Sequence, residues 1–83
     1  MVKKSLPAPK PKPATARTRI STNLKRLRGT RRLSQEQLAE LADFHRTYVS
    51  QLERCVTNIS IDGLERLAQA LEVDVIDLLK KSA

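Results

Sequence analysis

From Ile20 onward, the apolar residues of this chain recur three and four positions apart and never alternate strictly with polar ones. Ile20, Leu24 and Leu27 show this spacing first. It indicates amphipathic helices, because half-buried strands alternate apolar and polar residues. Leu41 and Ile61 fall on stripes that we expect to face the core. The sequence therefore predicts an all-helical fold with short connections.

Capping signals divide this region into five predicted helices. Ser34, followed three residues later by Gln37, forms a capping box that opens the second helix. Ser60 and Asp74 are suited to cap the fourth and the fifth helix. The first helix contains the Ile20 stripe, and the others cover residues 35–42, 46–54, 61–71 and 75–81.

Residues 1–17 are predicted to form a disordered basic tail, followed by a single domain over residues 18–83. The tail contains all four prolines and almost no bulky apolar residue, so it cannot contribute to a core. Residues 1–19 carry six basic side chains and no acid, and the net charge of the whole chain is +7. The tail could be a flexible basic arm that follows phosphates, a linker or a proline-rich docking segment.

The net charge of +7 favours a polyanionic partner, which is either nucleic acid or an acidic membrane surface. No apolar run approaches the roughly 20 residues of a membrane span. The Lys-rich start is followed by prolines and not by the apolar core of a signal peptide. We therefore expect a soluble cytoplasmic protein with no membrane segment.

A metal centre, a disulfide framework and an enzyme active site are all disfavoured. Cys55 is the single cysteine and His45 the single histidine, so one chain can form neither an internal disulfide nor a metal site of four protein ligands. With Gly29 and Gly63 as the only glycines, a glycine-rich phosphate loop is also missing. We expect a binding module with no catalytic residue, no metal and no cofactor.

The predicted helix over residues 46–54 has one outward polar face. Val49 and Leu52 point inward, and five polar residues lie on the opposite side. These are Arg46, Thr47, Ser50, Gln51 and Arg54. Arginine pairs bidentately with guanine, glutamine pairs with adenine, and the threonine methyl packs on that of thymine. Two short helices joined by a tight link form a helix-turn-helix, although a merely solvated helix face is the alternative.

The run SQEQLAELADFHRTYVSQLERCVTNISIDGLERLAQALEV resembles the phage repressor and Cro-type, or XRE-like, helix-turn-helix family. The resemblance extends from about Ile20 to Lys80. It implies a five-helix, lambda-repressor-like domain that binds operator DNA as a dimer and regulates transcription. Such a protein would associate with the nucleoid when it is bound to DNA.

Family resemblance also implies roles for individual positions. Arg46, Thr47 and Gln51 match the positions that read bases. Arg28 and Glu53 match a buried ion pair that joins the first helix to the third. Glu53 would therefore be structural, although it stands among residues that face the DNA.

Five further residues are expected near the DNA backbone. By resemblance, Gln35 would touch a phosphate and brace the reading helix, while Ser50 and Arg54 would lie beside the backbone. His45 precedes the reading helix, where it could approach a phosphate, cap the helix or simply be solvated. Tyr48 could donate its hydroxyl to a phosphate or simply pack against the core.

Several kinds of regulator share this domain. Within the family, the sequence looks like small stand-alone regulators such as the controller proteins of restriction-modification systems, and antitoxins that repress their own operons have the same fold. A protein-interaction adaptor is the rival outside DNA binding, because a Pro-Lys tail can dock on other proteins. Binding to RNA is disfavoured, since base stacking requires exposed aromatics and this chain offers only Phe44 and Tyr48.

Arg32 and Cys55 stand where the family commonly has glycine, at turns that pass through the left-handed region. A side chain in that conformation costs on the order of 1 kcal/mol. We expect Cys55 to be a free thiol without essential chemistry.

The fifth helix is predicted to mediate a homodimer. It carries more apolar residues than the core of one small domain needs. The residues expected at the interface are Val75, Ile76, Leu78 and Leu79.

Overall fold

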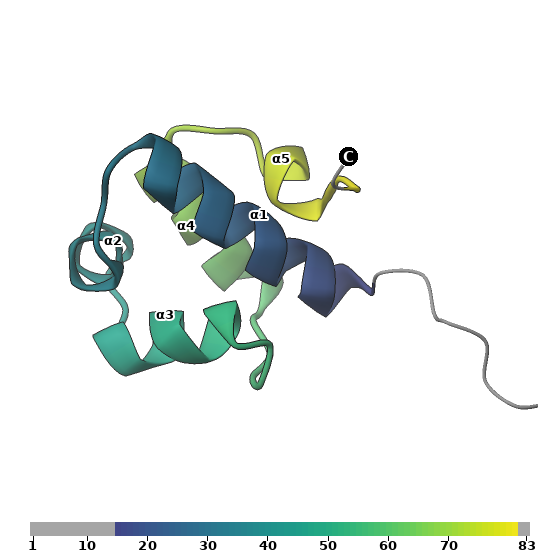
Figure 1. Ribbon diagram of the computed structural model, residues 1–83, viewed down its shortest axis with the longest axis horizontal. Coiled ribbons are helices and arrows are strands. Elements are labelled where there is room, and N and C mark those ends of the chain that lie inside the picture. Colours follow the sequence, from purple (N-terminus) through teal and green to yellow (C-terminus); the bar gives the residue numbers. More distant parts are fainter. Residues whose placement is uncertain (1–14, 82–83) are drawn as a thin grey trace, which may run out of the picture.

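The computed structural model describes residues 15–81, which contain five helices and no strand. The helices are α1 (Ala16–Thr30), α2 (Gln35–Ala42), α3 (Arg46–Glu53), α4 (Ile61–Leu71) and α5 (Ile76–Leu79). In Figure 1, α1 crosses the molecule with α4 behind it, α2 and α3 pack together to one side, and α5 packs on α1. The predicted all-helical, five-helix fold is confirmed. Within residues 15–81, no helix has the length and apolar character needed to cross a bilayer.

The first helix begins at Ala16, several residues before Ile20, where the apolar pattern starts. Thr15 adopts an extended conformation, and its hydroxyl accepts a hydrogen bond from the amide of Thr18 at 3.2 Å. The boundary that we expected after residue 17 therefore falls inside α1, because this cap adds a turn that the apolar pattern does not show. The remainder of the predicted basic tail, residues 1–14, lies outside the described residues.

The predicted caps of α2 and α4 are confirmed. The Ser34 hydroxyl accepts from the amide of Gln37 at 3.0 Å, and the Gln37 side chain accepts from the amide of Ser34 at 2.8 Å. The Ser60 hydroxyl accepts from the amide of Gly63 at 2.9 Å. Each cap satisfies backbone donors that the first turn of a helix leaves free, so both helix starts are encoded locally.

The last helix is shorter than the predicted span of residues 75–81. Asp74 does accept a hydrogen bond from the amide of Ile76 at 2.9 Å, but α5 ends after one turn. The buried amide group of Asn23 on α1 donates to the carbonyls of Leu78 at 3.0 Å and Lys80 at 2.9 Å. Lys80 has an extended conformation, so the helix ends at the point where the Asn23 side chain binds these two carbonyls.

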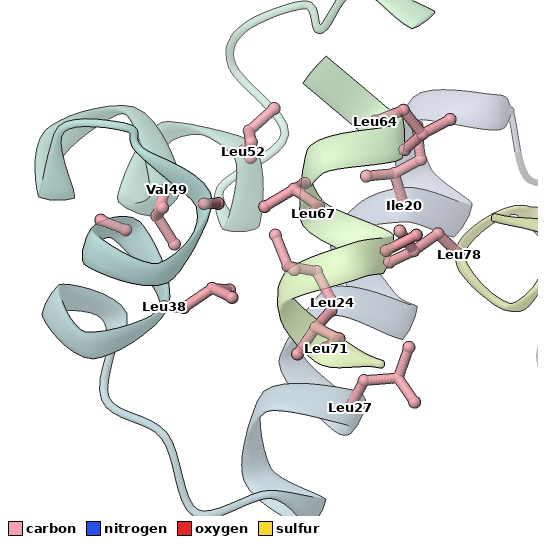
Figure 2. Packing of buried hydrophobic residues seen from close by; sticks show 13 residues of the cluster. Ile20, Leu24, Leu27, Leu38, Val49, Leu52, Leu64, Leu67, Leu71 and Leu78 are labelled. Carbon is pink, nitrogen blue, oxygen red and sulfur yellow. The ribbon is translucent and has the colours of Figure 1, made fainter. Parts of the chain in front are cut away.

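All five helices contribute to the core shown in Figure 2. Its buried apolar residues are Ile20, Leu24, Leu27, Leu38, Ala39, Ala42, Val49, Leu52, Leu64, Leu67, Ala68, Leu71 and Leu78. Val49 and Leu52 anchor α3 in this cluster. The opposite side of α3 is consequently held toward solvent.

Two residues expected in the core are on the surface. Leu41 is 61% exposed and Ile61 is 78% exposed. In α2 the buried positions are Leu38, Ala39 and Ala42, and at 100° per residue Leu41 lies roughly a quarter turn from their centre. Ile61 lies at a similar angle from the buried stripe of α4, whose first buried residue is Gly63.

Four helices end near a non-glycine residue in the left-handed region. These residues are Arg32, Asp43, Cys55 and Glu72, with φ angles of 57°, 61°, 64° and 59°. The left-handed turns expected at Arg32 and Cys55 are therefore present. After α3, the amide of Cys55 donates to Leu52 O at 3.1 Å and that of Val56 donates to Gln51 O at 3.0 Å, which closes the end of the helix.

Replacing Cys55 by glycine should raise the melting temperature, corresponding to a gain of a few tenths to about 1 kcal/mol, because glycine adopts this φ without steric cost. Cys55→Ala is the matched control, since it removes the thiol but retains the strained Cβ. Differential scanning calorimetry should find stabilisation in the glycine variant alone. A lower melting temperature in both variants would instead show that the half-buried thiol, 3.8 Å from the Thr18 hydroxyl, stabilises the turn.

Candidate nucleic-acid interface

Helix α3 separates a buried side from a polar one. Val49, Leu52 and Glu53 are buried. The outward side carries the five residues predicted from the sequence: Arg46, Thr47, Ser50, Gln51 and Arg54. Of these, the two arginines and the threonine are exposed, while the serine and the glutamine are half-buried. The structure therefore brings the predicted reading residues onto one accessible face.

The arginines of this face are free to meet an anionic partner. The three ion pairs found among residues 15–81 involve neither Arg46 nor Arg54. Arg46 is the first residue of α3, and Arg54 is the residue that follows its last turn. The two positive charges thus lie at opposite ends of the helix, with hydroxyl and amide groups between them.

His45 occupies the position before α3 in an extended conformation, but its side chain makes no capping hydrogen bond. It is exposed. Of the possibilities that the sequence left open for His45, side-chain capping is therefore not observed, whereas solvation and a phosphate contact both remain. The imidazole remains available to a ligand at the start of α3.

The carboxylate of Glu53 joins three helices behind the polar face. Arg28 on α1 donates from Nε to Oε2 at 2.6 Å and from Nη2 to Oε1 at 2.9 Å. Gln35 on α2 donates from Nε2 to Oε1 at 3.0 Å. The ion pair implied for Arg28 and Glu53 is thus present, and Gln35 holds the same carboxylate directly. This network sets the position of α3 relative to both neighbours.

The electrostatics of this network favour the charged forms. Burial raises the pKa of the Glu53 carboxyl, but hydrogen bonds from Arg28 and Gln35 and the charges of Arg28 and Lys25 outweigh it, so the pKa lies below its usual value. The hydrogen bond to Glu53 raises the pKa of Arg28. The pair is accordingly ionised at neutral pH.

Tyr48 faces the loop between α3 and α4. Its hydroxyl donates to the carbonyl of Asn58 at 2.6 Å, and its ring packs 4.9 Å from that of Phe44. Burial raises the pKa of Tyr48. The hydroxyl proton of Tyr48 is already donated to Asn58 O. The hydroxyl could therefore donate to a phosphate only after this hydrogen bond is broken. The structure favours packing for Tyr48.

Two residues that hold this site were not singled out in the sequence. Buried Ser21 on α1 donates from its hydroxyl to Glu53 O at 2.6 Å, at the end of α3. Arg17 near the start of α1 donates to the side-chain oxygen of Asn58. Ser21 lies one turn before Leu24 on the inner side of α1. A polar residue on a side of the helix that is otherwise apolar is the only sequence signal that could have pointed to its role.

The predicted dimer surface on α5 is partly occupied by the core. Leu78 is fully buried within the chain, so it cannot contact a second copy, and its place in the predicted interface is wrong. Val75 and Leu79 are half-buried against the core. Ile76 is 61% exposed and is accessible to a partner. One turn of helix is too short to present four apolar residues on the same side.

A family described as helix-turn-helix matches residues 24–78. Control protein C.BamHI of Bacillus amyloliquefaciens is 49% identical over 47 residues, which cover 57% of this chain and 58% of that protein, less than two thirds of its length.

Two solved structures share the fold. The hypothetical transcription factor NHTF from Neisseria has a TM-score of 0.79 at 37% identity, covering 94% of this chain and 90% of that chain. The restriction-modification controller protein C.AhdI from Aeromonas hydrophila has a TM-score of 0.72 at 35% identity, covering 75% of this chain and 94% of that chain.

Proposed function

The chain belongs to the helix-turn-helix family of phage repressor and Cro-type regulators, and on that premise we propose that it is a sequence-specific regulator of transcription that binds double-stranded DNA. The observation that carries this proposal is the outward face of α3. It presents arginine, threonine and glutamine side chains to solvent, while the core and the Glu53 network hold the helix from behind. A rigid helix with exposed polar side chains fits the major groove.

Each side chain on this face suits a particular part of the DNA. Arg46, Thr47 and Gln51 read base edges, because their functional groups match those of guanine, thymine and adenine. Arg54 and Ser50 contact the backbone, and exposed His45 contacts it at the start of the helix. Gln35 braces α3 by donating from Nε2 to Glu53, and the second proton of the same amide nitrogen contacts a phosphate.

We further propose that the protein acts as a dimer on an operator of its own gene. C.AhdI is a restriction-modification controller and C.BamHI is a control protein, which supports a small autoregulatory protein of this kind. Ile76 is the exposed apolar residue of α5, and half-buried Val75 and Leu79 flank it. A second copy covering these residues would pair two α3 helices on one duplex.

Selection from a library of randomised DNA duplexes tests both parts of the proposal. We expect the chain to enrich an inverted repeat whose half-sites are centred about 34 Å apart, one turn of DNA. Sedimentation of the selected duplex should find two chains on each DNA. Ile76→Lys should reduce that to one chain, whereas Ile61→Lys, a matched change at another exposed isoleucine, should not.

The result can also contradict each part separately. Enrichment of a single half-site with one bound chain would exclude the dimer and retain DNA reading. If no sequence is enriched, an adaptor that uses the same fold to bind proteins becomes the better explanation.

A further inference from the structure

Arg66 on α4 holds the turn that connects α2 to the reading helix. Its Nε donates to the carbonyl of Ala42 at 3.0 Å, and its Nη2 donates to the carbonyl of Asp43. Its guanidinium also lies over the ring of Phe44, 4.1 Å from the centroid. Three consecutive residues of the turn are therefore engaged by a single side chain from another helix.

These contacts offset two energetically unfavourable features of the turn. The last turn of α2 contains no basic residue to balance the partial negative charge of its free carbonyls, and Arg66 supplies that cation from α4. Asp43 is in the left-handed region, which is unfavourable for a residue with a side chain. A planar guanidinium can donate to two carbonyls while it stacks on a ring, which an ammonium cannot do.

The contacts continue from the turn into α3. Phe44 packs on Tyr48, with ring centroids 4.9 Å apart, and the Tyr48 hydroxyl donates to Asn58 O at 2.6 Å. Arg46 begins α3 only three residues after Asp43. The orientation of the first residues of α3 therefore depends on the path of this turn.

From this geometry we infer that Arg66 is a positioning residue for DNA reading, which rests on the function proposed above. Its guanidinium fixes the turn between α2 and α3, and thereby the angle at which Arg46 and Thr47 meet the bases. Arg66 itself does not contact the bases. Its loss should weaken binding to the operator and leave non-specific binding to phosphates nearly unchanged.

Arg31 offers a matched control within the same chain. It donates from Nη1 to the carbonyl of Leu71 at 3.2 Å, at the end of α4, and pairs with Glu72 at 3.0 Å. Glu72, like Asp43, is in the left-handed region. Arg31 thus stabilises a helix end in the same way, but the residues that follow lead to α5 and not to the reading helix.

The test compares Arg66→Met, Arg66→Lys and Arg31→Met on the inverted repeat selected by the unmodified chain and on a shuffled duplex of the same composition. We expect both Arg66 variants to lose about tenfold in affinity for the selected duplex and less than about twofold for the shuffled one. The ratio of the two affinities should stay within about twofold of the unmodified value in Arg31→Met. All measurements are made well below each melting temperature.

The only tyrosine of the chain provides an independent readout. The near-ultraviolet circular dichroism of Tyr48 should change in both Arg66 variants and remain unaltered in Arg31→Met. Equal losses on both duplexes would identify Arg66 as a phosphate contact, and full discrimination in Arg66→Lys would show that only its charge matters. Either result overturns the inference alone, whereas an unmodified chain that selects no sequence overturns the proposed function with it.

Discussion

Replacing Arg28 by methionine should lower the free energy of unfolding by about 3 kcal/mol, because removing one partner of a buried ion pair leaves the other charge without compensation. The Glu53 side chain is only 5% exposed, and Gln35 would remain as its one neutral partner. The Arg28 side chain is 22% exposed, so the effect should lie at the lower end of the range for buried pairs. Urea denaturation followed by far-ultraviolet circular dichroism measures the change.

The pH dependence of this loss distinguishes the ion pair from simple packing. In the unmodified chain the pKa of Glu53 is lowered on folding, so its contribution is complete above the usual pKa of glutamate and disappears as the pH falls through the folded value. In Arg28→Met the hydrogen bonds and charge that lower the pKa of Glu53 are lost, while burial still raises it. Protonating Glu53 therefore costs the folded state less free energy than in the unmodified chain. The difference in stability between the two proteins should therefore narrow on acidification. A difference that is constant with pH would attribute the loss to contacts of Arg28 that do not titrate, such as its hydrogen bond from Nη1 to Leu33 O at 2.9 Å.

Replacing Arg46 by alanine should weaken binding to the operator by about 1 to 3 kcal/mol and binding to shuffled DNA much less. Arg46 is exposed at the start of α3 and has no ion-pair partner among the described residues, and an arginine side chain can pair bidentately with guanine. Fluorescence anisotropy with both duplexes measures the two affinities.

Arg54→Ala is the control for this prediction, because it removes the same charge from the other end of the reading helix. We expect it to weaken both duplexes by similar factors and to reduce the slope of log affinity against log salt by about 0.9. If Arg46→Ala shows this pattern as well, its role is a phosphate contact and base reading must rest on Thr47 and Gln51.

The parts of this fold that could be predicted are those encoded within a few neighbouring residues. The starts of α2 and α4 follow from Ser34 and Ser60, whose hydroxyls each accept a hydrogen bond from the amide three residues later. The outward face of α3 follows from the 100° rotation per residue, which places Thr47 and Gln51 on the side opposite the buried Val49. These features need no information about the rest of the chain.

Other features depend on contacts between residues far apart in sequence. Asn23 ends α5 by taking carbonyls 55 and 57 positions away, so the apolar pattern alone predicted too long a helix. The same packing of α5 on α1 buries Leu78 and removes it from the surface, while Ile76 stays exposed. An apolar residue in a short helix can serve either the core or a partner, and its own spacing does not distinguish the two.

The candidate site shows the same division. The side chains that we propose to read bases lie on one short helix and were apparent from their spacing, and family resemblance added the ion pair of Arg28 with Glu53. Ser21 and Arg66 reach α3 and its preceding turn across 32 and 24 positions, with no local pattern to reveal them. A hydrogen bond from a side chain to a distant backbone carbonyl leaves no trace in sequence periodicity, since every residue type offers the same carbonyl. Local chemistry therefore determines which side chains can read DNA, and packing between helices determines how firmly and at what angle they are held.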